Sequence, residues 1–344
     1  MTNLQELAAT IDKIAIRGKG ILAADESTPT ITKRFQALGI ECTETSRRDY
    51  RELLMMTPGI SDYVAGVILF EETLNQKTSA GTLFPAALEA AGIIPGIKVD
   101  KGLVHLVNTT DEKITQGLDG LPERLADYKA KGARFAKWRA VYAISDTLPS
   151  KLAIKTNAEV LARYAAICQE QGIVPIVEPE ILIDGEHTLE RCEAVSEPVL
   201  HALYNALNRH KVKLEYIILK PSMVISGKGC SKQSGVKETA EATLRVLRRT
   251  VPAAVPTINF LSGGQTSEQA TGNLNEINKP GNLPWNVSFS YARALQEICM
   301  KIWGGKAENT KAAQSAFMKR AKLNSLASMG KYTPAMESEE VTIA

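Results

Sequence analysis

The sequence predicts an α/β fold in which eight parallel strands, each followed by helix, close into a (β/α)8 TIM barrel. Short apolar runs typical of buried strands recur along the 344 residues, and amphipathic segments with helical spacing lie between them. Polar side chains stand near the ends of most of these runs. Strands that alternate with helices pair in parallel through crossover helices, and eight such units suit a barrel in a chain of this length.

The eight predicted strands are, in chain order, residues 20–26, 64–70, 95–100, 134–139, 172–180, 214–221, 257–264 and 286–293. The clearest helices between them are predicted at residues 121–131, 157–171, 189–208, 238–250 and 267–278. Two further helices are expected outside the repeat, one opened by a capping box of Thr2 and Gln5 and one at about residues 308–327. No Ser-, Gly- or Pro-rich linker divides the chain, so we expect one domain over residues 1–344, with a flexible tail from about residue 331.

Composition excludes several classes of function. The net charge is only +3 and no long Lys/Arg block occurs, which gives nucleic-acid binding little support. No apolar stretch approaches the roughly 20 residues that span a bilayer. The five cysteines form no CxxC pair and the N-terminus is not a signal peptide, so we expect reduced thiols and a cytoplasmic location.

Neither a metal nor an organic cofactor is expected. The four histidines show no cluster with metal-ligand spacing, and no GxGxxG fingerprint or P-loop opens a helix. Catalysis would therefore depend on the side chains of the chain itself.

Candidate catalytic residues come from the strand ends. Seven of the eight predicted strands carry polar side chains at or near their carboxyl ends, namely Asp25, Lys98, Lys137 with Arg139, Glu178 with Glu180, Lys220, Ser262 and Arg293. The carboxyl ends of barrel strands form the active face of this fold. Any one of these residues could be an ordinary solvated charge, but their recurrence on seven strands predicts a single pocket.

Lys220 is the candidate nucleophile because it ends a buried apolar run and is followed by Pro221. Burial and the neighbouring cations Lys98 and Lys137 would favour its neutral form, which attacks ketones and aldehydes. The alternative is a strand-terminal lysine that reaches into water. Glu178 and Glu180 could supply the acid that an imine-forming reaction needs, and Asp25 could act as the base in cleavage of a carbon–carbon bond.

Two groups of residues predict phosphate sites on either side of Lys220. Ser262, Gly263 and Gly264 follow the seventh strand, and Ser290 and Arg293 close the eighth, where barrels often bind phosphate. A second group combines cations with hydroxyls and comprises Ser27, Thr30, Lys33, Arg34, Lys98 and Arg139. Together they predict a bisphosphorylated ketose as substrate.

From about residue 18 to residue 333 the chain resembles the class I (Schiff-base) fructose-bisphosphate aldolases. The matching motifs include GKGILAADEST, RFAKWR, GIVPIVEPEIL, ILKP, FLSGGQ and FSYARALQ. The resemblance implies a (β/α)8 barrel that is usually a homotetramer. It also implies reversible cleavage of fructose 1,6-bisphosphate to dihydroxyacetone phosphate and glyceraldehyde 3-phosphate.

The resemblance also implies roles for individual residues. Lys220 resembles the imine-forming lysine, Glu178 the general acid/base with Glu180 beside it, Asp25 the group that handles the hydroxyl proton, and Lys137 the cation that orients this chemistry. Ser262, Gly263, Gly264, Ser290 and Arg293 match the first phosphate site, Lys98 and Arg139 the second, and Thr30, Arg34 and Arg47 the far end of the sugar. The better-studied animal members end in a tyrosine that assists proton transfer, whereas this sequence ends in Val341-Thr342-Ile343-Ala344. We therefore expect another group to do that work or that step to be slow.

Two other functions remain open from the sequence. One is a different phosphosugar enzyme on the same barrel, such as a transaldolase-like lyase or an isomerase. The other is a non-catalytic scaffold that binds acidic partners through its cationic clefts. The presence of Asp25, Lys137, Glu178 and Lys220 together favours the aldolase, because a scaffold needs only charge.

Overall fold

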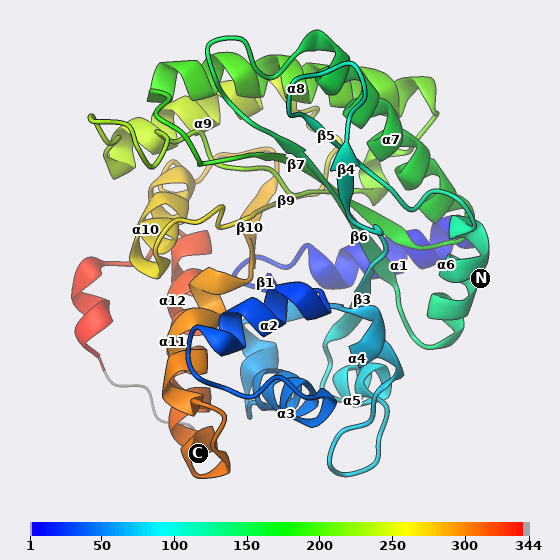
Figure 1. The fold of residues 1–344 in the computed structure, drawn as a ribbon, viewed down its shortest axis with the longest axis vertical. Coiled ribbons are helices and arrows are strands. Elements are labelled where there is room, and N and C mark those ends of the chain that lie inside the picture. The colour runs from blue at the N-terminus through cyan, green and yellow to red at the C-terminus, as the bar shows by residue number, and fades with distance from the viewer. Residues whose placement is uncertain (1, 340–344) are drawn as a thin grey trace.

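A closed barrel of parallel strands lies at the centre of the molecule and helices surround it (Figure 1). The computed structural model describes residues 2–339. Around the barrel the order of the strands is β1, β10, β9, β8, β7, β6, β3 and β2, and every neighbouring pair is parallel. The predicted (β/α)8 fold is confirmed, with additional helices at both ends of the chain.

The barrel strands are β1 Gly20–Ala24, β2 Val64–Leu69, β3 Ile94–Lys98, β6 Phe135–Tyr142, β7 Val174–Ile181, β8 Ile218–Leu219, β9 Thr257–Phe260 and β10 Asn286–Tyr291. Each lies in or overlaps a predicted strand. The short antiparallel hairpin of β4 Leu103–His105 and β5 Lys113–Thr115 was not predicted. It is inserted between β3 and β6, and its three-residue strands are too short to show an alternating pattern.

The prediction of one long strand at residues 214–221 is wrong. Leu214–Tyr216 instead forms the 3-10 helix η2, and only Ile218 and Leu219 belong to β8. The backbone N–H of Tyr216 bonds to the carbonyl of Lys213, which closes this turn at 3.1 Å. A short apolar run is compatible with a strand or with a buried turn, so its composition could not reveal the change.

The α-helices are α1 Asn3–Ile14, α2 Thr28–Gln36, α3 Glu44–Met55, α4 Glu71–Asn75, α5 Phe84–Ala90, α6 Leu121–Ala130, α7 Lys151–Glu170, α8 Leu189–Arg209, α9 Val236–Thr250, α10 Ser267–Asn278, α11 Arg293–Trp303 and α12 Thr310–Ser328. The other 3-10 helices are η1 Ile60–Asp62, η3 Ala307–Asn309 and η4 Pro334–Ser338. The five helices predicted between strands correspond to α6–α10, and the predicted extra helix at residues 308–327 corresponds to α12. Among residues 2–339 no helix is long and apolar enough to cross a membrane.

Helix α1 covers the amino-terminal end of the barrel. Its first turn has the predicted capping box, in which Thr2 and Gln5 exchange side-chain and backbone hydrogen bonds. Leu7, Ile11 and Ile14 pack against apolar side chains from inside the barrel, including Phe135. Burying each such side chain contributes about 1.5–3 kcal/mol. This end is therefore closed by packing.

Phe135 fills the lower part of the barrel because its neighbour on β3 has no side chain. A Cβ on Gly96 would lie 2.2 Å from the ring of Phe135, a distance that no side chain could tolerate. Tyr216 packs against the same apolar cluster, at the closed end and not beside Lys220. Since the interior is full here, a substrate can enter only from the carboxyl ends of the strands.

Part of the predicted flexible tail packs on α12. The guanidinium of Arg320 is 2% exposed and donates to both carboxylate oxygens of Glu337 at 2.6 and 2.8 Å. The hydroxyl of Tyr332 donates to the same carboxylate at 3.0 Å. Residues 340–344 of the predicted tail, which include the whole of the terminus Val341–Ala344 that lacks a tyrosine, lie outside the described residues, so the flexibility of the tail stays a prediction.

Candidate active site

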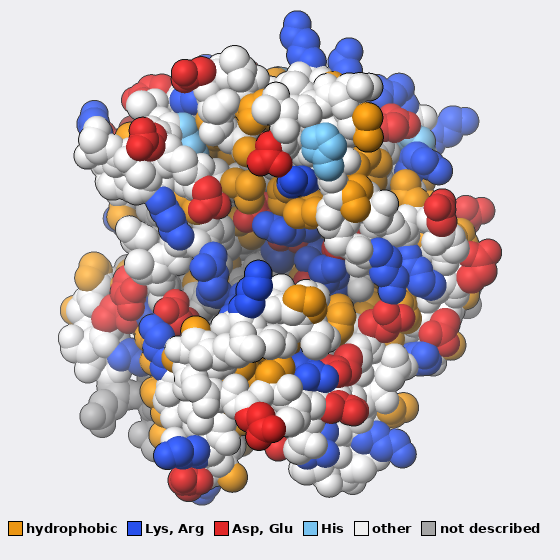
Figure 2. Space-filling model, in the orientation of Figure 1, with side chains coloured by type: hydrophobic (Ala, Val, Ile, Leu, Met, Phe, Trp, Pro, Cys, Tyr) orange, Lys and Arg blue, Asp and Glu red, His pale blue; other side chains and the backbone are white. Residues whose placement is uncertain are grey.

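The polar residues predicted from the strand ends face the same mouth of the barrel. Asp25 directly follows β1, Lys137 lies in β6, Glu178 lies in β7 and Lys220 directly follows β8. Because the strands are parallel, their carboxyl ends meet on one side. Figure 2 shows Lys and Arg side chains gathered in a hollow on the face of the molecule that lies over the barrel.

Four of these side chains form a continuous network of ion pairs. The ammonium of Lys137 lies 2.7 Å from Asp25 Oδ2 and 3.3 Å from Glu178 Oε2. The other oxygen of Glu178 lies 3.3 Å from Lys220 Nζ. Asp25, Lys137, Glu178 and Lys220 are 8%, 4%, 4% and 3% exposed. Such deeply buried charges are stable only when they are paired, and here negative and positive groups alternate.

The network holds Asp25 and Lys137 in their charged forms. Burial raises the pKa of Asp25, but Lys137, Lys220 and Lys98 outweigh it and hold that pKa well below its usual range. Burial lowers the pKa of Lys137, but Asp25 and Glu178 outweigh it and hold that pKa above its usual range. The site therefore contains an ionised carboxylate that can accept a proton and a fixed cation beside it.

Lys220 is positioned by the backbone as well as by Glu178. Its N–H donates to the carbonyl of Val177 at 2.9 Å, which extends the pairing of β7 and β8 by one residue. Its amine and the carboxyl group of Glu178 are therefore set side by side by neighbouring strands. A nucleophilic amine next to a carboxyl group is the arrangement that imine formation requires.

Glu180 and Lys98 belong to separate pairs beside this network. The guanidinium of Arg139 donates through Nε to Glu180, and this interaction raises the pKa of Arg139 against the opposing effect of burial. The ammonium of Lys98 lies 2.6 Å from Asp100 Oδ1. The prediction that Lys98 and Lys137 act on Lys220 by repulsion stays a prediction, and each of them is paired with a carboxylate.

Among the residues predicted to form the second phosphate site, Arg34 is held by an acidic residue, Glu26, that the strand-end prediction did not include. Arg34 and the buried Arg51 both pair with Glu26, at 2.5 and 2.9 Å. The hydroxyls of Ser27 and Thr30 lie 3.1 Å apart where α2 begins. Because Glu26 directly follows the predicted base Asp25 at a strand end, the strand-end pattern could have revealed it.

Arg47 pairs with a different carboxylate from that of Arg34. Its guanidinium forms two hydrogen bonds to Glu72 of α4, at 2.9 and 2.5 Å. Asp100, the partner of Lys98, was also missed, although it stands two residues further along the same strand end. The structure thus brings Arg34, Ser27 and Thr30 together and places Arg47 on α3.

The residues predicted to form the first phosphate site include a glycine turn after β9. Gly263 and Gly264 have φ of +55° and +87°, a backbone conformation that favours glycine. Ser290 Oγ is buried and has no hydrogen-bond partner among the described residues. A Cβ on Gly264 would lie 3.2 Å from Arg293 Nη2. A free hydroxyl, a guanidinium and an open backbone turn can together bind an oxyanion.

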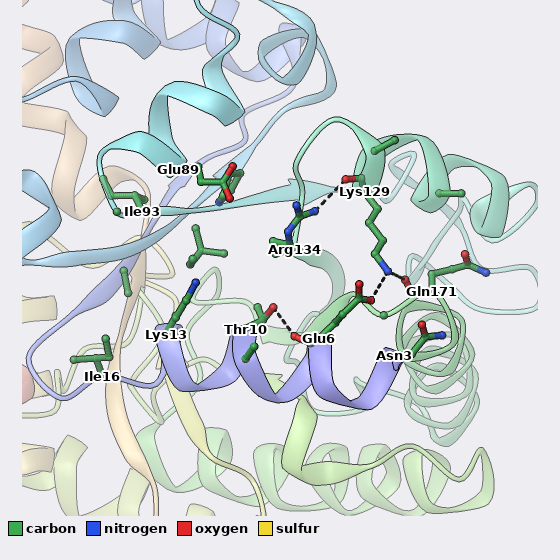
Figure 3. Close-up of a pocket in the computed structure, with 18 of the residues that line it drawn as sticks. Asn3, Glu6, Thr10, Lys13, Ile16, Glu89, Ile93, Lys129, Arg134 and Gln171 are labelled. Atoms are coloured by element: carbon green, nitrogen blue, oxygen red, sulfur yellow. Dashed lines mark hydrogen bonds and ion pairs between the residues drawn. The ribbon is translucent and has the colours of Figure 1, made fainter. Parts of the chain in front are cut away.

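A separate cavity of about 950 Å³ lies at the opposite end of the barrel, beside α1 (Figure 3). Lys13 and Arg134 point into it, and Lys129 reaches across to pair with Glu6 at 2.5 Å. Its walls come from residues that precede their strands, such as Ile93 and Gly172. The size of this cavity does not identify it as the active site, because the buried network of Asp25, Lys137, Glu178 and Lys220 lies at the other mouth of the barrel.

Comparison with known proteins decides the family. The model of the glycolytic class-I fructose-bisphosphate aldolases matches residues 6–343. The chain belongs to the class I fructose-bisphosphate aldolase family. As a member of this aldolase family it is a lyase, and the resemblance seen in its motifs is confirmed.

Relatives support the same conclusion over nearly the whole chain. A probable class 1 fructose-bisphosphate aldolase of Xanthomonas campestris is 54% identical over 96% of this chain and 99% of its own length. The cytoplasmic aldolase isozyme of Spinacia oleracea is 57% identical over 95% of this chain and 92% of its own length. A solved structure of the Plasmodium falciparum aldolase superposes with a TM-score of 0.95 at 50% identity and covers 96% of both chains.

Proposed function

We propose that this aldolase cleaves fructose 1,6-bisphosphate through an imine on Lys220. The observation that carries the proposal is the buried network Asp25–Lys137–Glu178–Lys220, in which each group lies within ion-pair distance of the next and the amine of Lys220 is paired directly with the carboxyl group of Glu178. A proton that moves from the ammonium of Lys220 to Glu178 leaves a neutral amine beside a carboxylic acid. Those are the two forms that imine formation needs.

The amine of Lys220 attacks the ketone carbon C2 of the sugar to form a carbinolamine. Glu178 then donates the proton with which the C2 oxygen leaves as water, and a protonated imine remains. Glu180, which is held by Arg139, lies two residues further along β7 and on the same face of the strand. We assign it a supporting role in these proton transfers.

Cleavage uses the other half of the network. Asp25 accepts the proton of the C4 hydroxyl, the C3–C4 bond breaks, and its electron pair moves to C3 and the protonated imine to give an enamine. Glyceraldehyde 3-phosphate leaves. Lys137 holds Asp25 ionised and oriented at 2.7 Å. Protonation of C3 and hydrolysis of the imine then release dihydroxyacetone phosphate and restore Lys220.

The two phosphate groups of the substrate are proposed to lie on opposite sides of Lys220. Ser262, Gly263, Gly264, Ser290 and Arg293 bind the phosphate on C1. The phosphate on C6 is bound by cations and hydroxyls from the other side of the mouth, namely Ser27, Thr30, Arg34, Arg47, Lys98 and Arg139. Four of these cations, Arg34, Arg47, Lys98 and Arg139, are paired with carboxylates in the structure. Each would therefore have to donate hydrogen bonds to the phosphate as well as to its carboxylate.

Trapping with borohydride tests the imine. The protein is incubated with dihydroxyacetone phosphate, reduced, digested and analysed by mass spectrometry. The adduct is expected on Lys220, it should be lost in Lys220→Met, and it should persist in Lys232→Met, which removes an exposed lysine of the following loop. Cleavage activity with an adduct on any other lysine would refute the assignment.

We further propose that the protein is a cytoplasmic homotetramer with a role in glycolysis. The names of relatives support the location, since those of Spinacia oleracea and Arabidopsis thaliana are cytoplasmic and cytosolic isozymes. The tetramer rests on the resemblance to the family alone. Light scattering after size exclusion should give four times the chain mass of 37.4 kDa, and a monomer mass would refute it.

A further inference from the structure

We propose that Lys228, in the loop between β8 and α9, is a second cationic ligand of the phosphate bound at Gly263 and Gly264. Lys228 lies beyond the predicted strand end at residue 221, and the proposal rests on the proposed position of the C1 phosphate. The ligand group is a phosphate monoester dianion. Lys228 would make the enzyme favour substrates that carry such a group next to the ketone.

Lys228 and Arg293 converge on one point of the glycine turn. A Cβ on Gly264 would lie 3.4 Å from Lys228 Nζ and 3.2 Å from Arg293 Nη2. Both cationic tips therefore border the open side of the turn, although they come from different parts of the chain. Lysine acts as a mobile point charge and arginine as a planar fork, so together they can bind several oxygens of one phosphate.

The loop that carries Lys228 is fixed by backbone hydrogen bonds. The N–H groups of Gly227, Lys228 and Gly229 donate to the carbonyls of His187, Ile183 and Gly185, at 2.8, 2.9 and 2.8 Å. These acceptors all lie in the segment that follows β7. The segment after β7 thus holds the backbone of Lys228 in place, while its side chain is exposed.

Glycines on both sides of Lys228 allow this close approach. A Cβ on Gly227 would lie 2.4 Å from the carbonyl oxygen of Gly185, and a Cβ on Gly229 would lie 2.9 Å from Glu186 Cγ. A larger residue at Gly227 would force the two segments apart. The Gly-Lys-Gly sequence therefore presents one cation from a tightly held backbone.

Neither cation has an acidic partner of its own. Among residues 2–339, no carboxylate lies within ion-pair distance of Lys228 or Arg293. By contrast, Lys98, Arg139 and Arg34 each hold a carboxylate. Two unneutralised cations beside an open backbone turn repel each other and attract an anion. Ser290, three residues before Arg293, has a buried hydroxyl without a hydrogen-bond partner among the described residues.

Steady-state kinetics with two substrates test the role of Lys228. In Lys228→Met, KM should rise by about three- to tenfold for both fructose 1,6-bisphosphate and fructose 1-phosphate, because both carry the C1 phosphate; this range is typical of an exposed charged hydrogen bond. The value of kcat should stay within about twofold, as expected when uniform binding is lost. Lys228→Arg should keep KM near that of the wild type, and Lys232→Met in the same loop should leave both constants unchanged.

Each contrary outcome has a distinct meaning. An unchanged KM in Lys228→Met, or a rise with the bisphosphate alone, would overturn the proposal. A defect that Lys228→Arg does not restore would also overturn it, because a packing role and not a charge would then be lost. Borohydride trapping of the wild type at Lys220 is measured on the same preparations. Failure of that trapping would refute the proposed mechanism independently of the result for Lys228.

Discussion

Replacing Lys137 with methionine should destabilise the fold in a way that depends strongly on pH. In the wild type, Asp25, Glu178, Lys137 and Lys220 form two negative and two positive buried groups. Lys137→Met keeps the length of the side chain but leaves two carboxylates facing one ammonium. The folded variant restores the balance most easily by binding one proton, which the unfolded chain does not hold at neutral pH.

The loss of unfolding free energy caused by Lys137→Met follows from the protonation of one carboxylate in the folded variant. With an ordinary Asp pKa of 3.8, binding that proton costs about 4.3 kcal/mol at pH 7 and about 1.6 kcal/mol at pH 5. In the wild type, the pair of Asp25 and Lys137 gives no such change of the unfolding free energy between pH 7 and pH 5. The lowered pKa of Asp25 gives stability that is lost only below pH 3.8, and the raised pKa of Lys137 gives stability that is lost only above pH 10.5. The destabilisation by Lys137→Met should therefore shrink by about 2.7 kcal/mol between pH 7 and pH 5.

Urea unfolding followed by circular dichroism at pH 7 and pH 5 measures this difference. Lys301→Met is the control, because it breaks the exposed ion pair with Glu297. It should cost no more than about 0.5 kcal/mol at either pH. If the cost of Lys137→Met is the same at both pH values, or is as small as that of the control, the buried network does not carry an uncompensated charge after the substitution and the reasoning fails.

Three further predictions concern the surroundings of the site. Glu26→Gln leaves Arg51, which is 1% exposed, without its carboxylate, and should lower the free energy of unfolding by about 3 kcal/mol, whereas Glu193→Gln, at a more exposed arginine pair, should cost less than about 1 kcal/mol. Burial lowers the pKa of His187 below 6.5, so stability should fall as pH drops below 6.5, and a His187→Phe variant that keeps this dependence in thermal melts would show that another group titrates. Gly227→Ala would place a Cβ 2.4 Å from a backbone oxygen and should raise KM for fructose 1-phosphate at least as much as Lys228→Met; an unchanged KM would show that the loop need not be held so closely.

The fold could be predicted from the sequence because the barrel repeats one simple unit. Each strand is a short buried run, and each strand is followed by an amphipathic helix with recognisable ends. The residue pattern failed where local composition does not determine the conformation. The run at 214–221 is mostly apolar, yet Leu214–Tyr216 turns as a 3-10 helix before β8 begins. The β4–β5 hairpin is exposed along β4 and has no apolar alternation to reveal it.

The candidate site could be predicted by residue type but not by pairing. Strand geometry brings Asp25, Lys137, Glu178 and Lys220 to one mouth, and their positions at strand ends indicated this in advance. The carboxylates that pair with the cations outside this network could not be inferred from positions at strand ends. Glu72, for example, lies in α4 and meets Arg47 of α3 only through the packing of the two helices. Lys228 lies in a loop without periodicity, so only the folded backbone shows that it reaches Gly264.

The ion pairs of the site offer a second explanation for the reactivity of Lys220, beside the predicted repulsion by Lys137. From the sequence, Lys137 was expected to favour the neutral amine by repulsion. In the structure Lys137 lies closest to Asp25, at 2.7 Å, and these two groups form one charge-balanced pair. Glu178 and Lys220, at 3.3 Å, form the second pair. In the proposed mechanism a proton can move within the second pair without changing the net charge of the site, so the buried network avoids the cost of an unbalanced ion. Asp25 and Lys137 then act mainly to keep that balance until the C4 hydroxyl proton is transferred, and this is why Lys137→Met should affect stability as well as cleavage.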